Sequence, residues 1–188
     1  MARVRDVEIG DVPETAREVY RRYGTEYGPF LNQVKVFAHR PAALRHLMGM
    51  LMEMNDDPVL DKRHLEIALV AVSRLNACEY CIVHHTPRAV EHGLSAAACE
   101  AILETEVPGF DALDTLVRDY AVAVTNDFQT IREATFDALR AHFSDTQIVE
   151  LTLRIALCGF FNRMNDALQI GLEEDAMTAM QAAGTART

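Results

Sequence analysis

Apolar residues recur along this chain at the three- and four-residue spacing of α-helices, and alternating strand patterns and tight hairpin turns are missing. Helix-starting prolines and helix-ending glycines divide the chain into segments. The pattern predicts a helix between Pro13 and Gly24, further helices over about 41–55, 61–75, 78–93, 95–103, 111–126, 130–143 and 144–171, and a short one after Glu173. We therefore expect an all-α fold.

Two consecutive segments are expected to form a helical hairpin. The first runs from about Asp61 to Leu75, and the second carries a pair of cysteines and ends at Gly93. The first segment places these apolar residues at core spacing: Leu65, Ala68, Leu69, Val72 and Leu75. In such a hairpin the helices over 61–75 and 78–93 would lie side by side.

One domain is expected over residues 1–182. A chain of 188 residues is long enough to bury a substantial core and suits a single globular unit. The clearest break is the run Glu106-Val107-Pro108-Gly109, which we interpret as a loop and not as a domain boundary. The tail 183–188 has nothing to bury and is expected to fray.

Charge and hydropathy exclude several classes of partner. The chain has 18 basic and 28 acidic residues, a net charge of −10, and no basic cluster long enough to follow a phosphate backbone. The N-terminus lacks the apolar segment of a signal peptide, and Glu150 and Arg154 interrupt the most apolar stretch, 148–161. We expect a cytoplasmic protein that binds neither nucleic acid nor membrane.

The densest reactive chemistry lies in Cys78-Glu79-Tyr80-Cys81-Ile82-Val83-His84-His85. In a helix at about 100° per residue, Cys78, Cys81 and His85 would project within roughly 60° of one another. A thiol attacks only as its thiolate, which a helix N-terminus and a nearby imidazole both favour. Cα atoms three residues apart in a helix lie about 5 Å apart, so Cys78 can close a disulfide on an oxidised Cys81.

Glu66 lies twelve residues before Cys78 among apolar neighbours. If the hairpin places Glu66 beside His85, the carboxylate can orient the imidazole and exchange a proton with it. The alternative is a solvated Glu66 paired with Lys62 or Arg63. Two further readings of the motif also remain open, a zinc site with Cys78, Cys81 and His85 as three ligands, and a structural role.

The other two cysteines are interpreted as packing residues, and His84 as a packing or interface residue. Cys99 and Cys158 lie in apolar surroundings, where a thiol packs as a small hydrophobe. His84 points away from the stripe and Tyr80 is expected to pack, so neither enters the mechanism. Polar residues in the late helix, Asn162, Arg163, Asn165 and Asp166, either meet polar groups of a buried site or a subunit neighbour, or serve as surface or capping residues.

The sequence contains a specific pattern: Glu66, eleven intervening residues, Cys78-x-x-Cys81 and then His85. With it, the chain resembles the AhpD-like, carboxymuconolactone decarboxylase superfamily of all-helical proteins, most strongly over 60–103 and more loosely over 145–172. The resemblance implies a multi-helix bundle with the cysteine motif at the start of a helix in a helical hairpin. One departure is Tyr80, which stands where the mycobacterial alkylhydroperoxidase has a second histidine.

Carried over to these positions, the resemblance implies Cys81 as the peroxidatic thiol, Cys78 as the resolving thiol, and His85 with Glu66 as a proton relay. It also implies a homo-oligomer, trimeric or hexameric, and re-reduction by an external dithiol or lipoyl-type protein. No Gly-rich fingerprint for flavin or nicotinamide occurs, so we expect no cofactor. No second Cys-x-x-Cys supplies a fourth ligand, so we expect no metal. We thus expect an alkylhydroperoxidase-like enzyme. The alternatives are a ring-cleaving decarboxylase and a non-enzymatic redox or zinc module.

Overall fold

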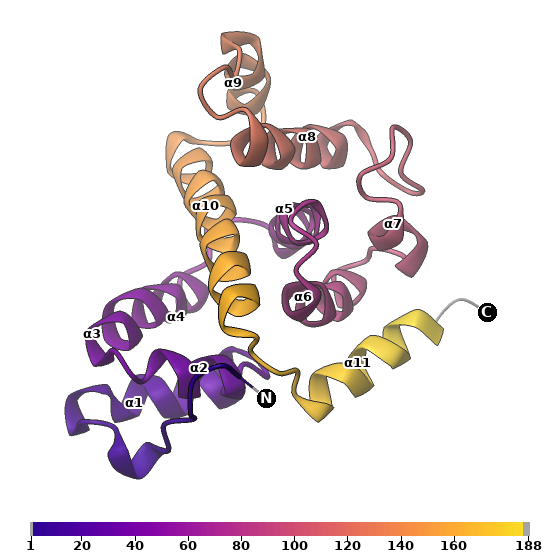
Figure 1. Cartoon of the computed structure of the whole chain (residues 1–188). Coiled ribbons are helices and arrows are strands. Elements are labelled where there is room, and N and C mark those ends of the chain that lie inside the picture. The colour runs from indigo at the N-terminus through magenta and orange to yellow at the C-terminus, as the bar shows by residue number, and fades with distance from the viewer. Residues whose placement is uncertain (1, 186–188) are drawn as a thin grey trace. The chain divides into compact units, whose positions relative to one another are not determined.

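The computed structural model describes residues 2–185, without the side chain of Thr185, and this part of the chain is helical with no strand (Figure 1). The predicted all-α class is confirmed. The α-helices are α1 Glu14–Arg22, α2 Leu31–Phe37, α3 Pro41–Ala43, α4 Gly49–Asp56, α5 Lys62–Leu75, α6 Glu79–Glu91, α7 Ala96–Glu100, α8 Ala112–Asn126, α9 Glu133–Arg140, α10 Asp145–Leu168 and α11 Glu174–Thr185. Three short segments are helical turns of other kinds. The segment η1 Ile9–Asp11 is a 3₁₀ helix, and η2 Tyr23–Tyr27 and η3 Leu44–Met48 are π-helices.

The described chain divides into two compact units. The first comprises residues up to Pro58 together with 165–178, and the second comprises 59–164 together with the end of α11. The expectation of one domain over 1–182 stays a prediction. Of the tail expected to fray, residues 183–185 continue α11, and 186–188 lie outside the described residues.

The first unit departs from the predicted helices at two places. Gly24 does not end the first helix, because η2 continues the helical path to Tyr27. A Cβ at Gly24 would lie 3.2 Å from Cδ1 of Leu31, so this glycine permits close packing of the chain. The seven-residue α2 was not predicted. Its N-cap residue, Phe30, forms no side-chain cap hydrogen bond. A helix this short and without a capping residue gives no clear signal in the sequence.

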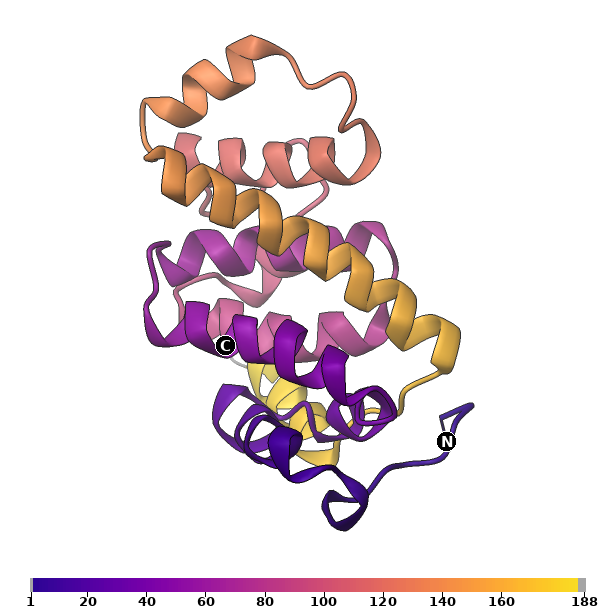
Figure 2. The same ribbon diagram turned by 90° about the vertical axis from the view of Figure 1, so that its left-hand side faces the viewer.

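Helix α5 is the centre of the second unit. It packs against α6 on one side and α8 on the other, as Figure 1 shows, so the predicted hairpin of α5 and α6 is present. Its central residues are buried in an apolar core together with residues of α8 and α10: Ile67, Ala68, Leu69, Val70, Ala71, Val72, Val117, Tyr120, Leu151 and Ile155. In Figure 2, α10 passes diagonally in front of α5. This central position determines where the polar residues of α5 meet other helices.

Three helices of the second unit start where they were predicted, and each has a side-chain cap. The Asp61 carboxylate accepts the N–H of Arg63, and Ser95 Oγ accepts the N–H of Ala98. Asp111 and Asp114 form a reciprocal capping box at α8. Helix ends were predicted less well. Helices α7, α9 and α10 all stop short of the predicted 103, 143 and 171, and α10 stops because Gln169 turns the chain at φ 50°.

An ion pair between a half-buried arginine and a buried aspartate joins three elements of the second unit. Nη2 of Arg63 donates to Oδ2 of Asp114 at 2.7 Å, and Nη1 of Arg63 donates to the carbonyl of Gly93 at 2.7 Å. Asp114 is 2% exposed, so the carboxylate depends on this partner for its charge. Arg63 thereby joins the start of α5 to α8 and to the turn after α6.

Arg63→Met should lower the free energy of unfolding by about 3 kcal/mol, because the Asp114 carboxylate would stay buried with its charge no longer neutralised. His64 Nε2 lies 3.7 Å from Asp114 Oδ1 and would compensate only in part. Urea unfolding followed by circular dichroism measures the change. Lys62→Met is the matched control at an exposed neighbour and should stay within about 0.5 kcal/mol of wild type. Equal loss in both variants would contradict this role for Arg63.

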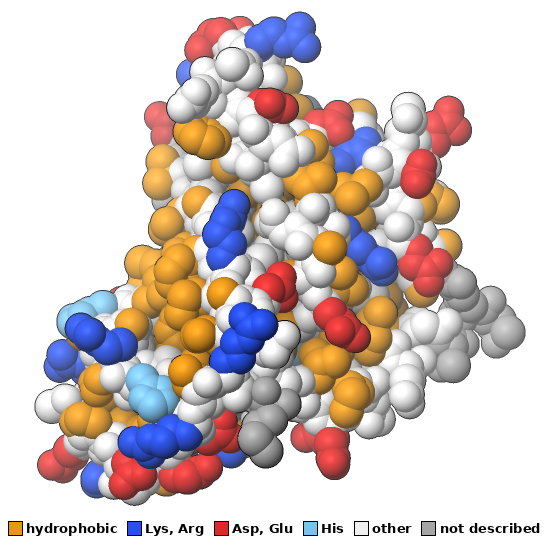
Figure 3. Space-filling view, viewed as in Figure 1, with side chains coloured by type: hydrophobic (Ala, Val, Ile, Leu, Met, Phe, Trp, Pro, Cys, Tyr) orange, Lys and Arg blue, Asp and Glu red, His pale blue; other side chains and the backbone are white. Residues whose placement is uncertain are grey.

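The surface carries mixed charge. Figure 3 shows acidic and basic side chains interspersed over the face in view. Among the described helices, none is both long and apolar enough to cross a membrane.

Candidate functional site

The turn between α5 and α6 places the first cysteine of the motif. Ala77 adopts a left-handed conformation with φ 52° and donates its N–H to the carbonyl of Arg74 at 3.1 Å. The N–H of Cys78 donates to the carbonyl of Ser73 at 3.0 Å. This pair of hydrogen bonds is the Schellman arrangement that ends many helices, usually with glycine at the left-handed position. The turn delivers Cys78 directly to the N-cap of α6.

Ala77→Gly should raise the free energy of unfolding by about 0.5–1 kcal/mol, because glycine adopts a positive φ without the clash that a Cβ makes there. The measurement is again urea unfolding. Ala97→Gly, at an exposed helical position of α7, is the control and should destabilise by about 0.5–1 kcal/mol. Opposite signs at the two sites are expected, and destabilisation at both would be evidence against strain at Ala77.

Both cysteines of the motif lie at the start of the 13-residue helix α6. Cys78 is the N-cap residue and fully buried, and Cys81, in the first turn, is 4% exposed. The N–H groups of a first helical turn have no partner within the helix, and the helix dipole favours negative charge at that end. The two sulfur-bearing side chains, three residues apart, thus lie at the positive end of the dipole of α6.

Glu66 and His85 meet across the hairpin. Nδ1 of His85 lies 2.9 Å from Oε2 of Glu66, and the two side chains are 13% and 7% exposed. A carboxylate only accepts hydrogen bonds, so Nδ1 donates and Nε2 keeps the lone pair that can take up a proton. The alternative of a solvated Glu66 paired with Lys62 or Arg63 is wrong, because Glu66 is buried and Arg63 binds Asp114.

His84 and Tyr80 pack against each other, as expected. His84 Nδ1 lies 2.6 Å from the carbonyl oxygen of Tyr80, and their rings stack with centroids 4.2 Å apart. Both side chains are buried. The two adjacent histidines therefore differ in environment, since His85 contacts a carboxylate and His84 contacts backbone and an aromatic ring.

The remaining cysteines are buried, as predicted. Burial raises the pKa of the Cys99 thiol to about 11 and that of the Cys158 thiol to about 12. Such thiols stay protonated near neutral pH and react slowly. Cys158 is not in purely apolar surroundings, however, because its sulfur lies 3.6 Å from Ser73 Oγ and 3.8 Å from Asn162 Nδ2.

Sequence reasoning left the position of Asn162 open. The structure buries this residue of α10 and places its Oδ1 2.8 Å from Nδ2 of Asn76, in the turn before Cys78. The sequence signal was a group of polar residues, Asn162 among them, that interrupts an apolar face of the late helix. Its partner could not be read from the sequence.

The other readings of the motif were a metal site and a structural role. Within residues 2–185, no three side chains of His, Cys, Asp or Glu are grouped so that they could hold a metal ion. Cys78, Cys81 and His85 therefore do not form the three-ligand set considered from sequence.

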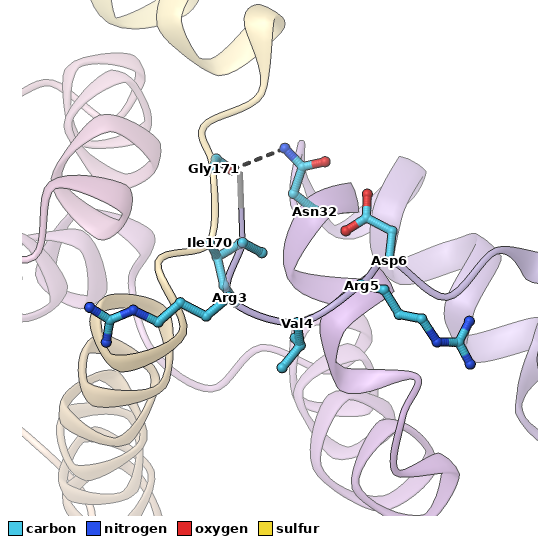
Figure 4. Close-up of a pocket in the computed structure, with 8 residues that line it drawn as sticks. Arg3, Val4, Arg5, Asp6, Asn32, Ile170 and Gly171 are labelled. Atoms are coloured by element: carbon cyan, nitrogen blue, oxygen red, sulfur yellow. Dashed lines mark hydrogen bonds between the residues drawn. The ribbon is translucent and has the colours of Figure 1, made fainter.

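A cleft of about 580 Å³ lies in the first unit and shares no residue with the cysteine motif. Its lining includes the N-terminal segment, Asn32 and the turn after α10. Figure 4 shows the side chains of Arg3 and Arg5 pointing away from each other, and Nη1 of Arg3 binds the carbonyl of Ala167 at 3.0 Å. The two arginines thus do not converge on a common anion.

Solved structures with a similar fold include AhpD-like proteins. An uncharacterized peroxidase-related protein from Ralstonia eutropha JMP134, described as an alkylhydroperoxidase AhpD core, superposes with a TM-score of 0.81 at 23% identity over 96% of both chains. A peroxidase-related protein from Silicibacter sp. TM1040 gives a TM-score of 0.69 at 21% identity over 94% of both chains. The chain has the AhpD-like fold.

Residues 41–118 match the model of the carboxymuconolactone decarboxylase family, and this segment contains Glu66, Cys78, Cys81 and His85. The resemblance to this family is thereby confirmed. A variant of the debrominase Bmp8, crystallised with 2,3,4-tribromopyrrole, shares the fold with a TM-score of 0.75 at 18% identity over 95% of both chains. Comparison of the sequence with curated proteins gave no match.

Proposed function

We propose that this protein is a thiol-dependent peroxidase that reduces alkyl hydroperoxides through a Cys78–Cys81 dithiol cycle. The observation that carries the proposal is the buried hydrogen bond between His85 and Glu66, on the same hairpin that presents both cysteines. His85 follows Cys81 by one turn of α6, and an oriented imidazole near a thiol at a helix N-terminus can activate a sulfur nucleophile.

The cycle begins with proton transfer from the Cys81 thiol to His85. The thiolate attacks the terminal oxygen of the hydroperoxide, an S–O bond forms as the O–O bond breaks, and the alkoxide takes the proton from His85 to leave as an alcohol. The thiol of Cys78 then attacks the sulfenic acid of Cys81. A disulfide forms and water leaves, so the two-electron reduction of the hydroperoxide is balanced by oxidation of two thiols.

The site favours a small, partly apolar oxidant. Cys81 is 4% exposed and its helix packs on the apolar core of the second unit. An alkyl hydroperoxide carries its polar group at one end, so the alkyl group can remain in apolar surroundings while the O–O bond approaches the sulfur. Highly charged peroxides should react more slowly.

An external dithiol, of lipoyl type or on a partner protein, would reduce the disulfide by thiol–disulfide exchange.

We further propose that the protein assembles as a homo-oligomer. Val149 and Phe160, 66% and 40% exposed, lie on one face of α10, since eleven residues correspond to about three turns. Size-exclusion chromatography with light scattering would give the number of subunits, and a monomer would contradict this part.

A direct test uses the wild-type protein with cumene hydroperoxide and dihydrolipoamide. We expect consumption of the hydroperoxide, and after reaction without reductant, a mass loss of two hydrogens in the peptide that contains Cys78 and Cys81. Oxidation of the protein once per site without turnover would favour the redox-sensing alternative. No oxidation at all would contradict the proposal.

Two other reactions are alternatives from the comparisons. The carboxymuconolactone decarboxylase match favours acid–base chemistry by Glu66 and His85, which needs neither thiol. The likeness to a debrominase suggests reductive debromination of a bromopyrrole, in which oxidation of Cys78 and Cys81 to a disulfide replaces one bromine with hydrogen and releases HBr. Assays for decarboxylation of a carboxymuconolactone and for bromide release from 2,3,4-tribromopyrrole separate both from peroxide reduction.

A further inference from the structure

A buried polar cluster joins α10 to the turn that precedes Cys78. We call it the Asn162 cluster, and its members are Ser73 and Asn76 on the α5 side and Cys158 and Asn162 on α10. Asn162 Oδ1 accepts from Nδ2 of Asn76 at 2.8 Å, and Asn162 Nδ2 lies 3.8 Å from Sγ of Cys158. Asn162 is 1% exposed, so its amide depends on these partners in place of water.

The cluster contacts the last turn of α5 at a second point. Ser73 Oγ donates to the carbonyl of Leu69 at 2.6 Å and lies 3.6 Å from Sγ of Cys158. The backbone carbonyl of the same Ser73 accepts the N–H of Cys78 at 3.0 Å. Residues on α10 therefore contact Asn76, which precedes Ala77, and Ser73, whose carbonyl accepts the N–H of Cys78.

This turn needs such support. Ala77 stands at φ 52°, where a residue with a Cβ costs about 1–2 kcal/mol relative to a right-handed conformation. Backbone in a sparsely populated conformation persists when neighbouring contacts determine it. The hydrogen bond from Asn76 to Asn162 bridges 86 residues of sequence and comes from another helix, so it restrains the turn independently of α5 and α6.

We infer that Asn162 is a positioning residue for Cys78, and that it sets how readily Cys78 closes the disulfide with Cys81. The inference rests on the proposed dithiol cycle. Disulfide geometry accepts only a narrow range of Cα separations and side-chain directions. Cys78 lies in the turn that Asn162 restrains, whereas Cys81 lies inside α6. Loss of the restraint should slow closure of the disulfide and leave attack of Cys81 on the hydroperoxide nearly unchanged.

The test compares Asn162→Leu with Asn165→Leu. Asn165 is a buried asparagine of the same helix whose Oδ1 accepts from Gln33 Nε2 at 2.9 Å, and both of these residues belong to the first unit. In single-turnover reactions with cumene hydroperoxide, rapid quench and mass spectrometry follow formation of the sulfenic acid and of the disulfide. We expect Asn162→Leu to slow disulfide closure about tenfold, with sulfenic acid formation within about threefold of the control.

A second readout needs no hydroperoxide. In glutathione redox buffers, the equilibrium constant for the Cys78–Cys81 disulfide should fall about tenfold in Asn162→Leu, which corresponds to a rise of about 30 mV in reduction potential. If the wild type does not reduce hydroperoxides, the proposed function fails while this equilibrium still tests the positioning. Equal closure rates and equal equilibria in Asn162→Leu and Asn165→Leu would overturn the inference.

Asn76→Ala removes the other partner of the same hydrogen bond, at a half-buried position in the turn. This variant replaces Asn162→Leu in the test if Asn162→Leu does not fold. It should produce the same loss of closure. The double variant should lose no more than either single variant, because both changes remove one interaction. Additive losses would contradict an action of Asn162 through Asn76.

Discussion

Cys81→Ser should reduce hydroperoxide turnover by about 10³-fold or more, because the hydroxyl that replaces the thiol is not ionised at neutral pH and is a far weaker nucleophile. Cys81 lies at the start of α6, in the turn where the helix dipole favours an anion. The measurement is consumption of cumene hydroperoxide with dihydrolipoamide as reductant. Activity that survives in Cys81→Ser would rule out the proposed mechanism.

Cys78→Ser should give a different defect at the same site. Without the resolving thiol, Cys81 can react once and stop as a sulfenic acid, which dimedone traps and mass spectrometry detects. Cys99→Ala is the matched control, since burial raises the pKa of that thiol to about 11 and it takes no part in the cycle. Its turnover should equal that of wild type.

His85→Ala should slow sulfenic acid formation by about 10²–10³-fold, the range that general acid–base groups contribute. Glu66→Gln should have a smaller effect, about tenfold, because the amide oxygen can still accept from Nδ1 of His85 but carries no charge to stabilise the imidazolium. Stopped-flow measurement of the first oxidation step across pH separates these variants. The double variant should resemble His85→Ala alone, since Glu66 acts through the imidazole.

His92→Ala is the control for a general loss of imidazole. His92 follows the last turn of α6 and is half-buried, with no place in the proposed relay. It should keep the wild-type rate of sulfenic acid formation within about twofold. A loss in His92→Ala as large as that in His85→Ala would mean that the fold of α6, and not the relay, limits the rate.

Local signals predicted much of the second unit. Asp61, Ser95 and Asp111 each begin a helix as predicted, because a side-chain cap satisfies N–H groups within three residues of itself. The same signals failed for α2, which has no cap and spans only seven residues. They also failed at Gly24, where the packing of Leu31 against the chain accounts for the glycine.

The sequence by itself determined the all-helical class, the hairpin of α5 and α6, and the reactive residue types Cys78, Cys81, His85 and Glu66. Helical periodicity and the spacing of a motif are local properties, so they can be read along the chain. Only the tertiary structure decided that Glu66 meets His85 and not Arg63, and that Asn162 binds Asn76. These contacts join residues 19 and 86 positions apart, and their formation depends on how α5, α6 and α10 pack to bury their apolar faces.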